Sequence, residues 1–307
     1  SSALAGLLLI YAGGLLFSPD RLRGRAESGR LLAGKAADAA ELSVAEGSGA
    51  PLVFKRASGA WSLEEEGASL PVQSSRVEGL LSSLEKVASL SPRSSSRASW
   101  KDFSLDETRC RHIVVKNAAG KSLADFYSGS YGPTGSDIYV RLAGKDSVYA
   151  AAADFGSYVE GGRASWLSRA LFKDVKPEDV QSVDYRSSLD LAGAARAAPK
   201  TVVWSAVRNG GSWAAKGAAG SGAAAAGDTV DAVLRSALSL EGDDMRAVVP
   251  PEAFAKTQAS IVMHLGSGKS LSFEVGGAAA DGLFYARSSA SPYVYEVSRY
   301  SLANVLR

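Results

Sequence analysis

The sequence contains very few of the side chains that form disulfides or bind metals. Its 307 residues include one cysteine, Cys110, and two histidines, His112 and His264. A single cysteine excludes an intrachain disulfide and a multi-thiolate metal site, and two histidines leave little for zinc. We therefore expect neither a metal nor a cofactor in this protein.

An excess of charge of either sign is missing as well. Lys and Arg number 34 and Asp and Glu number 32, so the formal net charge is +2, and the charges are interspersed. The clustered basic residues of a nucleic-acid-binding protein are therefore absent from the sequence. Hydrophobic residues make up 46% and charged residues 21%, as in folded water-soluble domains, and the length suggests roughly two of them.

Long hydrophobic runs are absent except near the N-terminus. Residues 3–17, ALAGLLLIYAGGLLF, carry no charge. We predict a transmembrane anchor over residues 1–18 and a linker over residues 19–30. A spanning helix needs about 20 residues, so we expect it to begin a few residues upstream of Ser1. The alternatives are a signal peptide, although no small-x-small cleavage site follows Phe17, and a buried core helix.

The residues after this run bear on its orientation. The charged residues of this flank are Arg21, Arg23, Arg25 and Arg30, with Asp20 and Glu27 offsetting them. Taken alone, the arginines favour a cytoplasmic position for the rest of the chain. A basic segment before Ser1 could set the opposite orientation, and large domains translocate largely regardless of charge.

The rest of the chain contains an internal duplication. Residues 113–123, IVVKNAAGKSL, match residues 261–271, IVMHLGSGKSL, at an offset of 261 − 113 = 148. Four further blocks recur in the same order: the tryptophans Trp61 and Trp213, an amphipathic run, the segments DIYVR/LFYAR, and the segments SVYAA/YVYEV; the first strands of the two copies match as well. Five blocks in one order indicate two copies of one structural unit. We predict a first unit over 31–160, a connector over 161–170 and a second unit over 171–307.

Each unit is predicted to be an α+β fold with a mostly antiparallel sheet and one or two covering helices. In the first unit, ELSVAE, PLVFKRA and AWSLEE alternate as half-buried strands, and four more strands follow as two hairpins. Between them, apolar residues at helical spacing predict a helix that Pro92 stops. These apolar residues are Val77, Leu80, Leu81, Leu84, Val87 and Leu90. The Gly/Ala-rich tract at 214–227 in the second unit is predicted to be a loop.

Several short motifs suggest chemistry but are better explained by structure. GSGKS at 266–270 lacks the earlier glycine of a phosphate-binding loop, because Met263 stands there, and the duplication places it in a hairpin turn. Ser83 and Lys86 have S-x-x-K spacing but fall on the polar side of the predicted helix. Cys110 lies between two arginines, which would lower its pKa, but we interpret it as a structural cysteine. We find no complete catalytic constellation and predict a protein that is not an enzyme.

Aromatic and arginine residues give the only candidate surface. Trp61 and Trp213 occupy the same point in the two units and are predicted to anchor each sheet against its helix, with a carbohydrate or peptide platform as the alternative. The tract at 127–141 is rich in Gly, Tyr and Ser, and its arginine recurs in the second unit. The candidate surface residues are Tyr131, Tyr139, Arg141, Tyr285 and Arg287. A salt bridge on the strand surface explains the recurring arginine about as well.

These features together resemble the family called domain of unknown function 4340. The residues that carry the resemblance are Gly59, Trp61 and Leu63 in a G-x-W-x-L turn, the helix VEGLLSSLEKVASL, and the Y-V-R and V-Y segments at 139–141 and 148–149. The resemblance covers residues 31–307, although the second unit has AAK where the first has SLE after its tryptophan.

The resemblance implies a placement and a role that the residues themselves do not give. Members of the family are bacterial envelope proteins, often associated with ABC-type exporters of the gliding-motility kind. By this resemblance we expect a single-pass inner-membrane protein with most of the chain extracytoplasmic. Its partners would be ABC transporter membrane subunits or other envelope proteins, and its role that of an accessory or scaffold subunit. The alternative is an extracytoplasmic module that binds a glycan or peptide in the cleft between the units.

Overall fold

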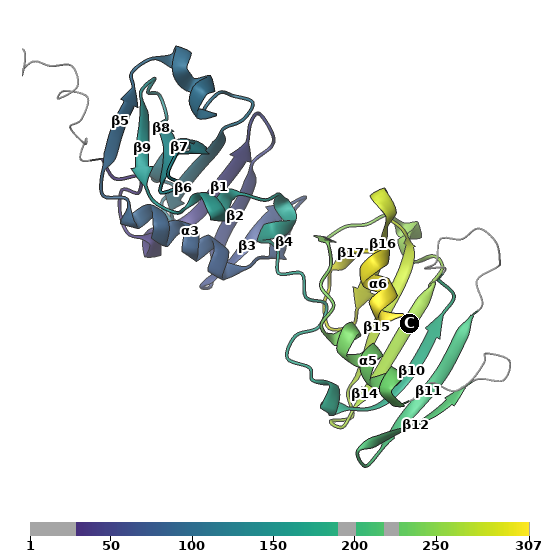
Figure 1. The fold of residues 1–307 in the computed structure, drawn as a ribbon. Helices are drawn as coiled ribbons and strands as arrows, with labels where there is room; N and C mark the ends of the chain where they lie inside the picture. The colour runs from purple at the N-terminus through teal and green to yellow at the C-terminus, as the bar shows by residue number, and fades with distance from the viewer. Residues whose placement is uncertain (1–28, 190–200, 218–226, 307) are drawn as a thin grey trace, which may run out of the picture. The chain divides into compact units, whose positions relative to one another are not determined.

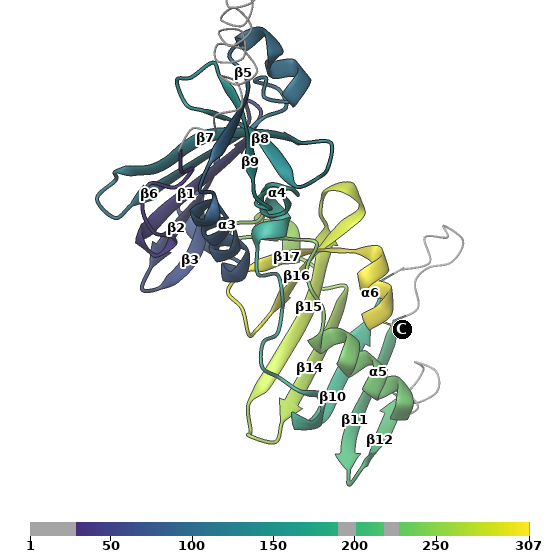
Figure 2. The ribbon, with the colours of Figure 1, turned by 60° about the vertical axis from the view of Figure 1, so that its left-hand side comes forward.

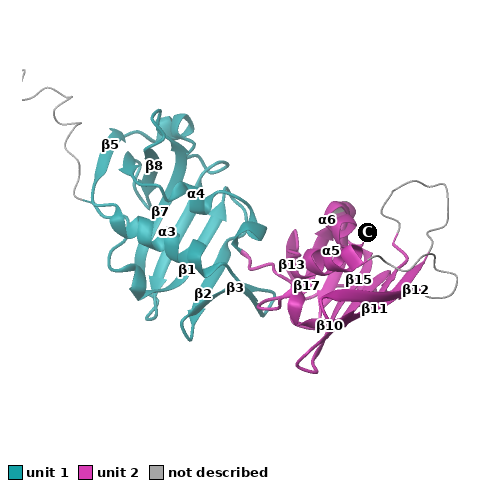
Figure 3. Cartoon of the chain, turned by 60° about the horizontal axis from the view of Figure 1, so that its bottom comes forward, with its two compact units in different colours: residues 1–166 teal, residues 167–307 magenta. Residues whose placement is uncertain are grey.

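The computed structural model describes residues 29–189, 201–217 and 227–306. The chain divides into two compact units, residues 1–166 and residues 167–307 (Figure 3). The predicted anchor over residues 1–18 and most of the linker lie outside the described residues. Within the described ranges, no helix is both long enough and apolar enough to span a membrane.

The first unit is built on a nine-stranded antiparallel sheet (Figure 1). The order of its strands across the sheet is β4-β3-β2-β1-β6-β7-β8-β9-β5. The strands are β1 (Ala39–Glu46), β2 (Leu52–Ala57), β3 (Ala60–Glu65), β4 (Ala68–Pro71), β5 (Leu90–Ser94), β6 (Arg111–Asn117), β7 (Ser122–Tyr131), β8 (Asp137–Leu142) and β9 (Val148–Ala152). The helices are α3 (Ser74–Lys86) and α4 (Gly156–Val159), and short 3-10 segments are η1 (Ala36–Asp38), η2 (Arg97–Phe103) and η3 (Arg163–Trp166).

The second unit repeats this plan with eight strands. Their order is β12-β11-β10-β14-β15-β16-β17-β13. The strands are β10 (Val180–Ser187), β11 (Val202–Asn209), β12 (Ser212–Gly217), β13 (Asp244–Arg246), β14 (Ala259–Leu265), β15 (Ser270–Ala278), β16 (Leu283–Ser288) and β17 (Val294–Ser298). The helices are α5 (Gly227–Leu238) and α6 (Arg299–Val305), and the 3-10 segments are η4 (Pro177–Asp179), η5 (Pro251–Phe254) and η6 (Ala280–Gly282). Equivalent strands thus occupy equivalent places in both sheets, as the sequence duplication predicts.

Helices cover one face of each sheet, which we call the inner face. The predicted apolar stripe of α3 is buried against it through Val77, Leu80, Leu81 and Leu84. In the second unit, α5 and α6 lie side by side on the inner face (Figures 1 and 2), and α5 buries Val230, Val233, Leu234 and Ala237. Because side chains alternate along a strand, the opposite face receives the other half of each strand's residues. We call that opposite face the outer face.

The turn before the first strand has the same hydrogen bond in both units. The main-chain N–H of Lys35 donates to Asp38 Oδ2 at 3.1 Å before β1, and Lys176 and Asp179 repeat this bond at 3.1 Å before β10. Each turn therefore fixes the start of the first strand of its unit in the same way.

The tryptophan pair has the predicted structural role. Trp61 is buried on the inner face, with 3% of its surface exposed. Trp213 is half-buried, and its Nε1–H donates to Asp231 of α5 at 2.8 Å. Trp213 thus connects its sheet to α5, Trp61 lies in the core on the helix-covered face, and neither is placed as an exposed platform.

Two local predictions are wrong. The first helix ends at Lys86, and residues Leu90–Ser94 form β5 rather than the last turn of that helix. Pro92 has no N–H for a central ladder, and it is tolerated because β5 is the last strand of its sheet and pairs only with β9. In the second unit, the first residues of the Gly/Ala tract belong to β12, which ends at Gly217, instead of forming a loop.

Candidate functional site

A row of side chains crosses the outer face of the first sheet. Four neighbouring strands place one residue each in register: Ala45 of β1 lies opposite His112 of β6, His112 opposite Tyr127 of β7, and Tyr127 opposite Arg141 of β8. These residues alternate with inner-face core residues, so the pleat turns all four away from α3. The register therefore brings together side chains that are far apart in the sequence.

The segment η2 covers one half of this outer face. Trp100 and Leu105 pack with Val148 of β9 in a buried cluster, and Phe103 and Tyr139 pack against them. The Trp100 indole N–H also donates to the Asp146 main-chain oxygen at 2.9 Å, which fixes the ring in place. The other half of the face, over β1 and β6, stays open beside this cover.

The rings and cations at the edge of η2 form one continuous stack. The Arg141 guanidinium carbon lies 3.9 Å from the Trp100 ring centroid and 3.5 Å from the Tyr127 ring centroid. Tyr127 stacks on His112 with centroids 4.2 Å apart and planes 9° apart. Arg97 closes the other end, 4.8 Å from the Trp100 centroid. Trp100 is therefore in contact with two arginines, and Tyr127 lies between Arg141 and His112.

This stack borders a hollow of about 690 Å³ on the outer face. Its floor is formed by β1 and β6, and its rim is the turn at residues 47–51 after β1. The polar and ionisable side chains that line it are Ser43, Ser48, Arg97, Glu107, Cys110, His112, Tyr127 and Arg141. A hollow of this size with a few converging polar groups is the usual form of a binding site.

The charges of the hollow are unequally paired. Arg97 lies 3.3 Å from a Glu107 carboxylate oxygen, and His112 Nε2 lies 2.8 Å from Asp125 Oδ1. Arg141 is only 6% exposed, and no carboxylate of the described residues lies within ion-pair distance of it. Its Nε–H donates to the Leu105 main-chain oxygen at 3.3 Å. The guanidinium is thus a buried cation held by aromatic faces.

Cys110 is the buried thiol beneath this cation. It is free and 2% exposed. Burial raises the pKa of the Cys110 thiol, and the Arg141 guanidinium offsets this only in part. The flanking arginines therefore do not produce the lowered pKa that their sequence positions suggest, and the structural interpretation of this cysteine agrees with the structure.

The second unit carries different side chains at the same positions. Glu274 takes the place of Tyr127, and it receives two hydrogen bonds from Arg287, at 2.8 and 2.6 Å. Arg287 also lies over the Phe254 ring at 4.3 Å. The strand-surface salt bridge is therefore correct for Arg287 but wrong for Arg141, because the duplicated arginine has a carboxylate partner only in the second unit.

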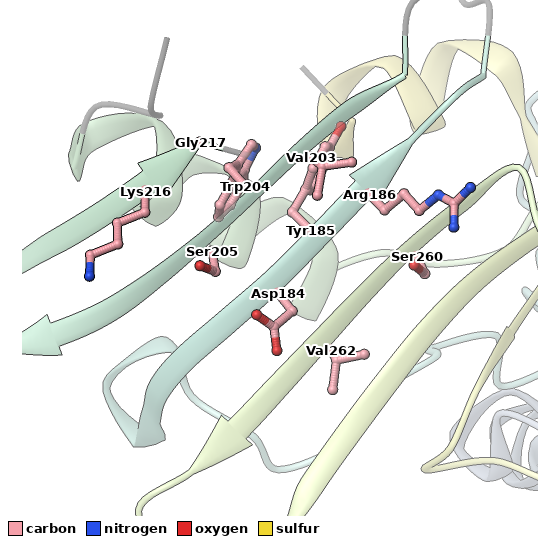
Figure 4. Close-up of a pocket in the computed structure, with 10 residues that line it drawn as sticks. All are labelled: Asp184, Tyr185, Arg186, Val203, Trp204, Ser205, Lys216, Gly217, Ser260 and Val262. Carbon is pink, nitrogen blue, oxygen red and sulfur yellow. The ribbon is translucent and has the colours of Figure 1, made fainter. Parts of the chain in front are cut away.

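A smaller hollow of about 340 Å³ lies over β10, β11 and β14 of the second sheet (Figure 4). Asp184, Ser205 and Val262 project into it from neighbouring strands, and Lys216 and Arg186 stand at its sides. This outer face combines charged side chains of both signs with the valines Val203, Val207 and Val262.

A serine, a histidine and an aspartate also meet on this face. His264 Nδ1 lies 2.8 Å from Ser270 Oγ, and its Nε2 lies 3.2 Å from Asp184 Oδ2. Catalytic triads hold the carboxylate buried, so that it fixes the imidazole. Here the Asp184 side chain is 63% exposed and that of His264 is 43% exposed. The group is a solvated polar network at the end of a hairpin.

The predicted surface residues of the first unit do not form one exposed surface. Arg141 is the buried centre of the stack, and Tyr139 packs edge-on against Phe103 with centroids 4.6 Å apart. Tyr131 is half-buried, and its hydroxyl lies where a Cβ at residue 156 would be. Tyr285 and Arg287 belong to the second unit.

The prediction missed Trp100 and Tyr127 and rejected His112. Tyr127 could have been recognised from strand alternation, which places it on the outer face. Trp100 has no such signal, because η2 is an irregular connection.

Histidine, cysteine and carboxylate side chains are the usual ligands of metal ions in proteins. No three such side chains converge within the described ranges.

Comparisons with known proteins identify a family and no closer relative. No curated protein and no solved structure matches the chain. The family model described as "Domain of unknown function (DUF4340)" matches residues 61–255, which is more than half of the chain and includes parts of both units. The chain therefore belongs to the DUF4340 family.

Proposed function

We propose that this protein is a non-enzymatic, membrane-anchored extracytoplasmic subunit that serves an ABC-type transport system as an accessory or scaffold. Support comes from the membership in the DUF4340 family, the hydrophobic run at residues 3–17 and the outer faces of the two sheets. The observation that carries the proposal is the pair of outer faces, one on each unit, which the α-helices leave uncovered and the 3-10 segments cover only in part.

The two outer faces differ in what they offer. In the first unit, η2 covers only part of the face and leaves the hollow beside Arg141. In the second unit, the smaller hollow is flanked by side chains of both signs, among them Asp184 and Lys216. A scaffold subunit that contacts more than one partner surface needs such unlike surfaces on one chain, whereas two copies kept for stability alone would not need them to diverge.

Photocrosslinking tests the proposal in the native membrane. A photoreactive amino acid replaces Ser43 on the first outer face or Ser205 on the second, in the full-length tagged chain. The controls carry it at Ser75 of α3 and Arg235 of α5, on the helix side of the units. We expect crosslinks to a membrane subunit of an ABC transporter from the outer-face positions and few from the controls.

Affinity purification from the same membranes supplies the second measurement. A transporter subunit that is stoichiometric with the tagged chain agrees with the proposal. A different stoichiometric partner without any transporter subunit refutes the transport role. Equal crosslinking from all four positions refutes the assignment of the outer faces as the contact surfaces.

The second candidate function is a binding module for a glycan or peptide. The hollow of about 690 Å³ favours it, because its size suits a small ligand or a short segment. This function predicts a soluble ligand that copurifies or binds in the absence of any membrane partner, which the same purification reveals.

A further inference from the structure

We propose that the hollow on the first outer face binds a carboxylate of a partner polypeptide, and that Arg141 is the group that holds it. The inference rests on the proposed function and names the chemistry of the contact. It depends on one juxtaposition: a buried guanidinium without a carboxylate of its own lies at the wall of an open hollow.

Part of the hydrogen-bonding capacity of Arg141 is unused. A guanidinium has five N–H donors in a planar fork; here the Nε–H donates to the Leu105 main-chain oxygen and the guanidinium also hydrogen-bonds the Cys110 thiol, which leaves further N–H donors for a ligand. Trp100 and Tyr127 hold the plane from both sides, so the Nη groups stand in a fixed orientation. Buried charges in proteins are usually paired, and a planar fork matches the two oxygens of a carboxylate.

The duplication supplies a template for the missing partner. In the second unit, Arg287 donates two hydrogen bonds to the carboxylate of Glu274 on the neighbouring strand. In the first unit, Tyr127 occupies that strand position, so the carboxylate is replaced by a ring and a hollow adjoins the arginine. An external carboxylate would restore in the first unit the pair that the second unit makes internally.

The local charge favours a carboxylate over a phosphate. Arg97 is paired with Glu107, and the His112 Nε2 contacts Asp125, so both of these groups already have a carboxylate partner. Arg141 remains as one unpaired positive charge. A single positive charge balances a monoanion, whereas a phosphate near its second ionisation would leave excess negative charge in the hollow.

The aromatic residues argue against a neutral sugar as the ligand. Sugars and flat rings stack on exposed aromatic faces, but Trp100 is buried and both Trp100 and Tyr127 are already in contact with the protein's own side chains. The hollow of about 690 Å³ has room for several residues around the carboxylate. We therefore assign the occupant as a polypeptide segment with an acidic side chain or a free C-terminus.

Fluorine NMR on the full chain in detergent micelles tests this assignment. The protein, which has five tryptophans, is labelled with 5-fluorotryptophan, and Trp100→Phe assigns the resonance of Trp100. The probes are acetyl-tetraalanine with a free C-terminus, the same peptide as its amide, acetyl-Ala-Ala-Asp-Ala amide, and inorganic phosphate. The two carboxylate peptides distinguish a C-terminal from a side-chain carboxylate.

We expect at least one carboxylate peptide to shift the Trp100 resonance saturably and the neutral amide to leave it unchanged. Arg141→Met should weaken that binding by about tenfold or more, since charge-assisted hydrogen bonds are lost. Arg287→Met is the matched control in the second unit and should change the affinity by less than about twofold, because that site is independent. Ala45→Glu adds a competing carboxylate to the hollow and keeps Arg141 and its stack, and it should also weaken peptide binding. This second variant keeps the test valid if Arg141→Met fails to fold.

Three results would overturn the inference. They are the absence of a saturable shift with both carboxylate peptides, an unchanged affinity in Arg141→Met and Ala45→Glu, and a response to phosphate as strong as that to the peptides. If the titration fails while the Ser43 and Ser205 crosslinks to the transporter persist, only the inference about the carboxylate falls. If binding is observed without any transporter crosslink, the transport role falls and the site stands.

Discussion

The duplicated glycines in the equivalent strands β7 and β15 provide the sharpest test of the fold. Gly129 lies where the ladder between β7 and β8 shifts register, and Gly276 lies at the matching shift between β15 and β16. A Cβ added at Gly129 would come within 2.1 Å of the Phe103 main-chain oxygen, and one at Gly276 within 2.1 Å of the Ala253 main-chain oxygen. In both units a 3-10 segment crosses the outer face so closely that only hydrogen fits.

The variant Gly129→Ala should therefore be destabilised. The oxygen belongs to the backbone of η2, so η2 has to move by about 1 Å before an ordinary contact is reached. Overpacking of this kind costs about 1–3 kcal/mol, occasionally more. Alanine also restricts the unfolded chain, which offsets about 0.4–1 kcal/mol of that cost. We expect a net loss of about 1–2 kcal/mol in the free energy of unfolding.

Urea unfolding, followed by tryptophan fluorescence, measures this loss. Gly162→Ala is the control, because no atom lies within 4 Å of its added Cβ and its φ is not positive, so it should change stability by less than about 0.5 kcal/mol. Gly276→Ala should have an effect like that of Gly129→Ala but on the transition of the second unit. A Gly129→Ala variant as stable as the Gly162→Ala control would refute the close crossing of η2.

Three further predictions concern other parts of the chain. The Arg109 guanidinium and the Thr108 donors hold the pKa of Asp106 in the folded protein well below its ordinary value. The ionised Asp106 carboxylate therefore stabilises the fold at pH values above its ordinary pKa, and this stabilisation is lost as the pH falls toward the lowered pKa of the folded protein. Asp106→Asn should therefore lower the melting temperature at pH 7 but have a diminishing effect below about pH 4. An equal decrease in melting temperature at pH 7 and below pH 4 would contradict this prediction. Trp213→Phe loses the bond to Asp231 and should destabilise the second unit by about 1–3 kcal/mol in urea unfolding; a double-mutant cycle with Asp231→Ala that shows no coupling would contradict it. Protease added to intact spheroplasts should digest both units of the full-length chain, and digestion only after lysis would instead place them in the cytoplasm.

Much of the fold could be predicted from the sequence because its signals are local and repeated. Alternating residues defined most strands, and apolar residues at helical spacing defined the buried side of α3. The repeat then distinguished a hairpin turn at GSGKS from a phosphate-binding loop, and the chain does turn there between β14 and β15. Such patterns depend on neighbours within a few residues, and comparison of the two copies removes much of the remaining ambiguity.

The site could not be predicted in the same way, because it depends on register and on an irregular connection. Arg141 was recognised as a recurring residue, but its burial required the strand pairing that sets Tyr127 beside it and the η2 segment that places Trp100 above it. Segment β5 was missed for a related reason, since the tolerance of Pro92 depends on an edge position that only the assembled sheet defines.

The sequence by itself thus determined the two-unit α+β plan, most of the strands, and the inner faces that the helices cover. Only the tertiary structure decided that one copy of the duplicated arginine pairs with Glu274 while the other, Arg141, is stacked between rings beside an open hollow. The physical reason is that periodicity reports which face of a strand is buried, whereas the pairing of a charge depends on side chains brought together from separate strands.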